Sequence, residues 1–139
     1  MNLGKEILQY RSYFIDPEEL LDDLLGELKF RNYSVTRVNN IDNVFQRDNT
    51  PAGSLNFKYY KIIEFCNLES CSHIISEALL SGVFMPARFL VYEEEKREGA
   101  NLAFLKPTAF AEMFESKNLM KLAEIMEKDM VEISEELIG

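Results

Sequence analysis

Two cysteines and the only histidine of the chain lie close together, as Cys66, Cys71 and His73. Thiolate and imidazole are preferred ligands of zinc and copper. A structural zinc site needs four ligands, however, and the spacing of these three matches no standard zinc motif. We therefore predict no metal site.

The same three residues allow other chemistry. Cys66 could act as a nucleophile with His73 as its base, because histidine activates a thiol by accepting its proton. A reversible disulfide between Cys66 and Cys71 could instead sense redox state, since cytosolic disulfides are usually transient. The third interpretation makes Cys66 a buried core residue and places His73 on a polar helix face. We favour the third and keep a thiol-based redox sensor or cysteine-dependent enzyme centred on Cys66 as an alternative.

The elements that position these residues are a strand and a helix. Residues 59–66 are rich in β-branched and aromatic side chains, which predicts a strand, and residues 70–81 have helical periodicity. Cys66 and Asn67 would then lie at a strand-to-helix turn, where free amides and the helix dipole favour an anion. Residues 88–94 predict a second strand, in which alternation puts Glu93 on the apolar side. If the two strands are neighbours, Cys66, Asn67, Tyr92 and Glu93 are the candidate ligand-binding residues.

The rest of the chain predicts an α+β domain. Asp16 and Pro17 are a helix start, and leucines recur with helical spacing up to about residue 30. Apolar residues from 119 to 137 step by three and four, which predicts a long amphipathic C-terminal helix capped by Ser116 or Asn118. Further strands are expected at 10–15, 33–38 and 101–105, a short helix at 40–45, a loop at 48–54 and a helix opened by Pro107. We predict one two-layer domain over residues 1–139, with a mixed or antiparallel sheet of about four or five strands covered by helices.

Several short motifs, in order, resemble a known family. After the strand that ends in Cys66-Asn67, the matching pieces are Met85-Pro86-Ala87, Val91-Tyr92-Glu93 and Leu105-Lys106-Pro107-Thr108. In this order they resemble the bacterial and archaeal domain of unknown function family 302, over residues 10–138. Members commonly have Pro after Cys-Asn and Cys where this chain has Leu68 and Ala87. A thiol pair between the two strands is therefore not expected here. The resemblance implies a compact α+β homodimer with no established reaction.

Composition narrows the possible partners. The 139 residues carry a formal charge of −9, and the pI is about 4.7, which argues against nucleic acid. More than half of the excess lies in residues 107–139, with three basic and eight acidic side chains, as expected of solvent-exposed helix faces. There is no nucleotide-binding or metalloprotease motif, so we predict no cofactor.

The sequence therefore predicts a binding module more readily than an enzyme. No signal peptide or membrane-spanning run is present, so we expect a cytoplasmic protein that does not bind membranes. Our leading hypothesis is a non-enzymatic homodimer that binds an unknown small ligand or protein. A structural subunit of a larger complex is a further alternative, which would show a broad exposed apolar patch.

Overall fold

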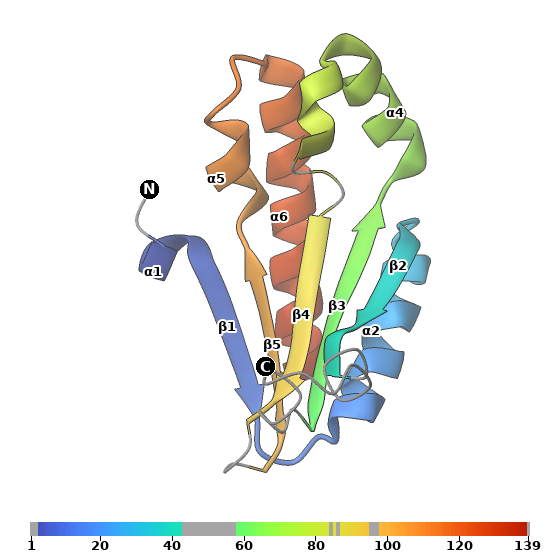
Figure 1. Ribbon diagram of the computed structural model, residues 1–139, viewed down its shortest axis with the longest axis vertical. Helices are drawn as coiled ribbons and strands as arrows, with labels where there is room; N and C mark the ends of the chain where they lie inside the picture. Colours follow the sequence, from blue (N-terminus) through green and yellow to red (C-terminus); the bar gives the residue numbers. More distant parts are fainter. Residues whose placement is uncertain (1–2, 43–57, 84, 86, 95–97, 139) are drawn as a thin grey trace.

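The computed structural model describes residues 3–42, 58–83, 85, 87–94 and 98–138 (Figure 1). Its sheet has five strands: β1 (Ile7–Ser12), β2 (Ser34–Asn40), β3 (Tyr59–Cys66), β4 (Ala87–Glu93) and β5 (Ala100–Leu105). Their spatial order is β1-β5-β4-β3-β2, and every neighbouring pair is antiparallel. The predicted α+β class is confirmed, and the sheet is antiparallel rather than mixed.

Two long helices, α2 (Pro17–Phe30) and α6 (Lys117–Ile138), pack on the same face of this sheet and lie behind it in Figure 1. The described helices leave the opposite face uncovered. Shorter helical segments lie at one end of the sheet or beside it: α1 (Leu3–Glu6), α4 (Leu68–Glu77), the 3₁₀ segment η2 (Leu79–Val83) and α5 (Pro107–Ala111). No helix in the described ranges is both long enough and apolar enough to cross a membrane.

The start of α2 follows from its sequence. The Asp16 carboxylate accepts a hydrogen bond from the Glu18 backbone N–H, and Pro17 occupies the first turn without losing a needed donor. The leucines of the predicted stripe are buried at Leu20, Leu21, Leu24 and Leu28. This helix was predicted with the same bounds, because capping and periodicity both indicate it.

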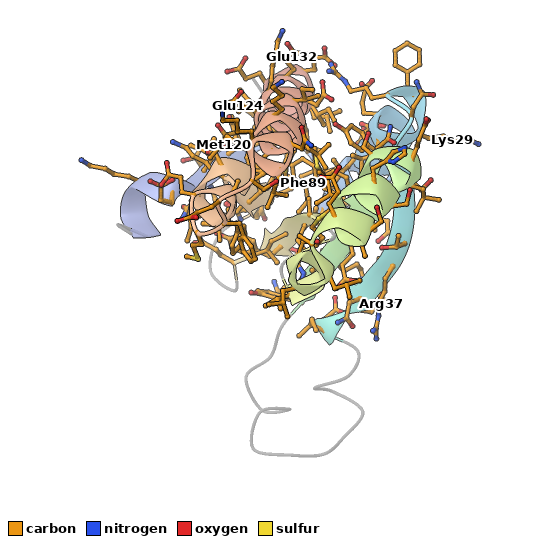
Figure 2. All side chains as sticks on the ribbon, turned by 90° about the horizontal axis from the view of Figure 1, so that it is seen from above. Lys29, Arg37, Phe89, Met120, Glu124 and Glu132 are labelled. Carbon is orange, nitrogen blue, oxygen red and sulfur yellow. The ribbon has the colours of Figure 1, made fainter. Side chains whose placement is uncertain are left out.

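Aromatic side chains form the centre of the core. Phe65 on β3 stacks on Phe89 of β4 with ring centroids 5.3 Å apart, and Phe104 of β5 meets Phe89 edge-on at the same distance. Figure 2 shows Phe89 between the sheet and the helices, while Glu124 points away from the core. Met130 and Ile133 of α6 are buried in the same cluster. Each fully buried side chain of this size stabilises the fold by roughly 1.5–3 kcal/mol.

Two elements differ by several residues from the sequence prediction, the first strand and the helix after Cys66. The first strand spans 7–12 rather than 10–15, because its pairing runs from Ile7 opposite Leu105 to Ser12 opposite Ala100. It ends where the chain passes Gly99, whose φ of 107° and lack of a Cβ allow contact with the Ser12 carbonyl. The helix predicted at 70–81 begins at Leu68 and ends at Glu77, after which the chain tightens into η2. Most of the short helix predicted at 40–45 and all of the loop at 48–54 lie outside the described residues.

Candidate functional site

Asn67 is the N-cap of α4. Its side-chain oxygen accepts a hydrogen bond from the Ser70 backbone N–H at 3.1 Å. This satisfies one of the amides that a helix start leaves without a partner. The strand-to-helix turn is therefore where it was predicted, and the side chain of Asn67 is engaged in holding that turn.

Cys66 and Cys71 lie next to each other as buried, free thiols. Burial raises the pKa of the Cys71 thiol to about 12, and the neighbouring, hydrogen-bonded Cys66 contributes to the rise. A thiol with this pKa stays protonated at neutral pH, and the thiolate is the reactive form. The arrangement resembles that of a structural cysteine more than that of a catalytic one.

His73 does not join the two thiols in a metal site. It lies two residues after Cys71 on α4 and is exposed, because positions two apart lie on different helix faces. Within the described ranges, no group of three His, Cys, Asp or Glu side chains is placed to hold a metal ion.

The antiparallel register separates Tyr92 and Glu93 from Cys66 and Asn67. Tyr92 lies opposite Tyr60, and Glu93 lies opposite Tyr59, at the start of β3. Cys66 is at the far end of that strand, roughly 20 Å away for six residues of extended chain. The two strands are neighbours, as expected, but the structure places the two pairs of candidate residues at opposite ends of the sheet.

Tyr92 belongs to a polar row on the uncovered face. The Arg11 guanidinium donates to Asn101 Oδ1 at 3.1 Å, and Asn101 Nδ2 donates to the Tyr92 carbonyl at 3.2 Å. Partial burial raises the pKa of the Tyr92 phenol, and the charge of Glu94 raises it further. These contacts tie β1, β5 and β4 together, which gives the row a structural role.

A cavity of about 390 Å³ lies at the other end of the sheet, where η2, α5 and the first half of α6 meet β4 and β5 (upper part of Figure 1). Its floor is formed by buried Leu119, Ala123 and Met126 of α6. Val83 at its edge is 81% exposed, and Arg88 of β4 also belongs to the lining. The remaining lining residues among those described are Met85, Ala87, Leu105, Pro107, Phe110 and Leu122.

Arg88 is the only charged residue among the described residues that line the cavity. Its nearest acidic partner is Glu64 on the adjacent strand, with Nη2 and Oε1 3.5 Å apart. Because the Arg88 side chain is mostly exposed, this long ion pair contributes little to stability, roughly 0–1 kcal/mol. The Arg88 side chain therefore lies with Glu64 on the face of the sheet opposite Phe89.

The sequence indicated the neighbourhood of this cavity but not the cavity itself. The junctions at 85–87 and 105–107 are the pieces that carry the family resemblance, and both contribute lining residues. Leu119, Ala123 and Met126 read as ordinary core positions of an amphipathic helix. The sequence offered one indication of a cavity here: on this face of the helix the small Ala123 lies between the larger Leu119 and Met126.

Comparison with known proteins agrees with this fold. Residues 9–137 match the family described as Domain of unknown function DUF302. The chain belongs to this family. It is similar to the structure described as an uncharacterized conserved protein DUF302 from Bacillus stearothermophilus, with a TM-score of 0.79 and 21% sequence identity. The similarity covers 96% of this chain and 98% of the other, and at this identity it shows the shared fold. No curated protein matches the chain.

Proposed function

We propose that the chain is a non-enzymatic, cytoplasmic module that binds a small, mainly apolar molecule in the cavity between η2, α5 and α6. The observation that carries the proposal is the cavity itself. Its volume of about 390 Å³ falls within the range of roughly 300–1,000 Å³ that small-molecule sites occupy. Apolar side chains dominate its walls, as is usual for a small-molecule site.

Apolar burial supplies the driving force for this binding. Leu119, Ala123 and Met126 present one face of α6 to the cavity, and all three are almost fully shielded by the protein. The apolar surface that a ligand would remove from water lies on the more exposed lining residues Val83, Phe110 and Leu122, and its burial is worth about 25 cal/mol per Å². Since the floor is part of a packed helix, the cavity is preformed and little ordering is needed on binding.

The test uses the neutral fluorescent dye Nile red and two variants of α6. We expect saturable fluorescence enhancement with the unaltered chain and at least tenfold weaker binding for Ala123→Phe, whose ring would occupy the cavity. Ile125→Phe is the matched control, because it adds a ring to the exposed side of the same helix. Both variants are first checked for cooperative thermal unfolding. Equal dye binding by all three proteins would overturn the proposal.

We also propose that the protein forms a homodimer through the surface of η2. Leu79, Leu80 and Val83 are 75–81% exposed within five residues of chain. Large apolar side chains gathered in this way are typical of an interaction surface. A second copy of the chain is the occupant we propose, and a structural subunit of a larger complex would use the same surface for a different protein.

A redox role of Cys66 is the second candidate function, favoured by the contact between its thiol and that of Cys71. A peroxide could oxidise the two thiols to one disulfide, with water as the reduced product. Burial of both thiols and the raised pKa of Cys71 would make this reaction slow. Binding in the cavity is therefore the stronger proposal.

A further inference from the structure

We infer that a second copy of the chain completes the wall of the cavity, so that ligand binding and dimer formation strengthen each other; this inference rests on the proposed function. Val83 belongs to both sites. It lines the cavity, and it is one of the three large apolar residues of η2 that are 75–81% exposed. The edge of the cavity and the proposed dimer surface are therefore continuous at this residue (upper part of Figure 1).

The segment η2 is bonded to a wall of the cavity. Ser81, between the exposed residues, is fully buried, and its backbone N–H donates to the Ala78 carbonyl at 2.9 Å. The Ser81 carbonyl accepts a hydrogen bond from the Met85 N–H at 3.2 Å, and Met85 lines the cavity. A contact made on the outside of η2 therefore acts on a segment that is fixed to the cavity lining.

The surface of η2 suits a second copy of itself. Residues Leu79–Val83 include no charged side chain, whereas the chain as a whole carries a formal charge of −9. Two copies that meet through η2 therefore bring no like charges of this segment opposite each other, and both remove apolar surface from water. A partner recruited by opposite charge would instead be drawn to the acidic parts of the surface.

The exposure of Val83 determines the sign of the coupling. In a single chain Val83 is 81% exposed, so a ligand that contacts it leaves part of its own apolar surface in water. In a dimer formed through η2, the second copy lies against this edge and covers that part of the ligand. The ligand then buries more apolar surface in the dimer than in the single chain, and it should bind the dimer more tightly. By linkage, the ligand must in turn stabilise the dimer.

The experiment measures Nile red binding at protein concentrations below and above the monomer–dimer midpoint, which light scattering locates. We expect the dye to bind the dimer about tenfold more tightly than the monomer. Because the dimer holds two cavities, saturating dye should lower the dissociation constant of the dimer by the square of this factor, about a hundredfold. Sedimentation velocity followed at the absorbance of the bound dye gives the mass of the dye-bound species.

A substitution outside the cavity tests the same coupling. Leu80 is 75% exposed on η2 and is not among the described residues that line the cavity. Leu80→Glu should keep the chain monomeric, and its dye affinity should equal that of the unaltered protein diluted to the monomer. Phe14→Glu is the matched control, because it adds the same charge at a fully exposed apolar residue outside η2. It should retain both the dimer and the tighter dye binding.

The outcomes separate this inference from the proposed function. Dye affinity that is the same on both sides of the monomer–dimer midpoint would overturn the coupling and leave the cavity site and the dimer intact. Weaker dye binding by the dimer would overturn it as well, because the second copy would then obstruct the cavity. A chain that stays monomeric at every concentration would contradict the dimer itself. Dye enhancement that Ala123→Phe leaves unchanged would contradict the cavity site.

Discussion

Arg31 Nη1 donates a hydrogen bond to Glu132 Oε2 over 2.8 Å, which joins the end of α2 to the C-terminal half of α6. The same guanidinium contacts Asp129 at 3.2 Å and Glu136 at 3.1 Å. Arg31 is the C-cap residue of α2, so a single side chain fixes the spacing of the two helices that cover the sheet. These contacts predict a specific dependence of stability on pH.

Replacement of Arg31 by Met should lower the melting temperature at pH 7 and have a smaller effect in acid. The hydrogen bond from Arg31 lowers the pKa of Glu132 in the folded protein. A carboxyl with a lowered folded-state pKa stabilises the fold above its ordinary pKa of about 4.3. That stabilisation is lost as the pH falls through the lower folded-state value. Scanning calorimetry from pH 7 to pH 3 at low salt measures the difference, with Lys29→Met as the control. A constant difference across this range would contradict the prediction.

Tyr33→Phe should destabilise the protein by about 1–2 kcal/mol. The buried Tyr33 phenol donates to Asp129 Oδ2 at 2.5 Å, and its removal leaves that carboxylate with one partner fewer. The ring remains in its edge-on contact with Phe65, so packing should be retained. Urea unfolding gives the free-energy difference. Tyr13→Phe, at a mostly exposed tyrosine, is the control and should change stability by less than about 0.5 kcal/mol. Equal effects of the two substitutions would rule out the hydrogen bond as the cause.

Asn67→Ala should cost about 1 kcal/mol of stability, because the N-cap of α4 loses its side-chain acceptor. Asn67→Asp keeps an acceptor at the same position and should retain most of the stability. Denaturant unfolding of the three proteins tests the cap, and Nile red titration tests whether Asn67 also takes part in binding. If Asn67→Asp is as unstable as Asn67→Ala, capping is not the role of this residue.

The two cysteines should react slowly with a thiol reagent in the folded protein. Both are buried, and burial raises the pKa of Cys71 to about 12, so little thiolate is present at pH 8. Labelling with a chromogenic disulfide should be complete within minutes in denaturant and at least a hundredfold slower without it. The Cys66→Ser and Cys71→Ser variants assign the rates to residues. Fast labelling of Cys66 in the folded state would instead support the redox candidate.

Leu80→Glu should shift the protein toward the monomer if η2 forms the dimer contact. Light scattering coupled to size exclusion should give twice the chain mass of 16.1 kDa for the unaltered protein and a value near 16.1 kDa for the variant. Phe14→Glu is the control, since Phe14 is exposed but lies between β1 and α2. A monomer at every concentration of the unaltered chain would refute the homodimer.

Elements with a strong local sequence signal were predicted well. Asp16, Pro17 and the leucine spacing were enough for α2, and the β-branched and aromatic run at 59–66 was enough for β3. The end of α4 was placed too late. Gly82 is a common stop signal, but the helix ends at Glu77, where Ala78 adopts an extended conformation before the 3₁₀ segment begins at Leu79. The short α1 before β1 was not predicted, since four residues give no periodic pattern.

The candidate site could be predicted only in part. Cys66 and Asn67 lie at the predicted turn, but their distance from Tyr92 depends on strand direction, which no local pattern encodes. The same pairing of β3 and β4 in a parallel register would have brought these residues together. The cavity is harder still, because β4, β5, α5 and α6 contribute to it from positions up to about forty residues apart in the sequence.

The position of β1 has a consequence for how the chain reaches this fold. Ile7 pairs with Leu105. Among the described strands, β1, the first in the chain, therefore pairs only with β5, the last. Pairing two strands that are far apart in the sequence costs chain entropy before the stabilising contacts form. Folding rates therefore fall as such long-range pairings become more frequent. During translation, β2 and β3 can pair early as a local hairpin, while β1 waits until β5 has left the ribosome. We therefore expect the β1 edge to be the last part of the sheet to form and the first to open.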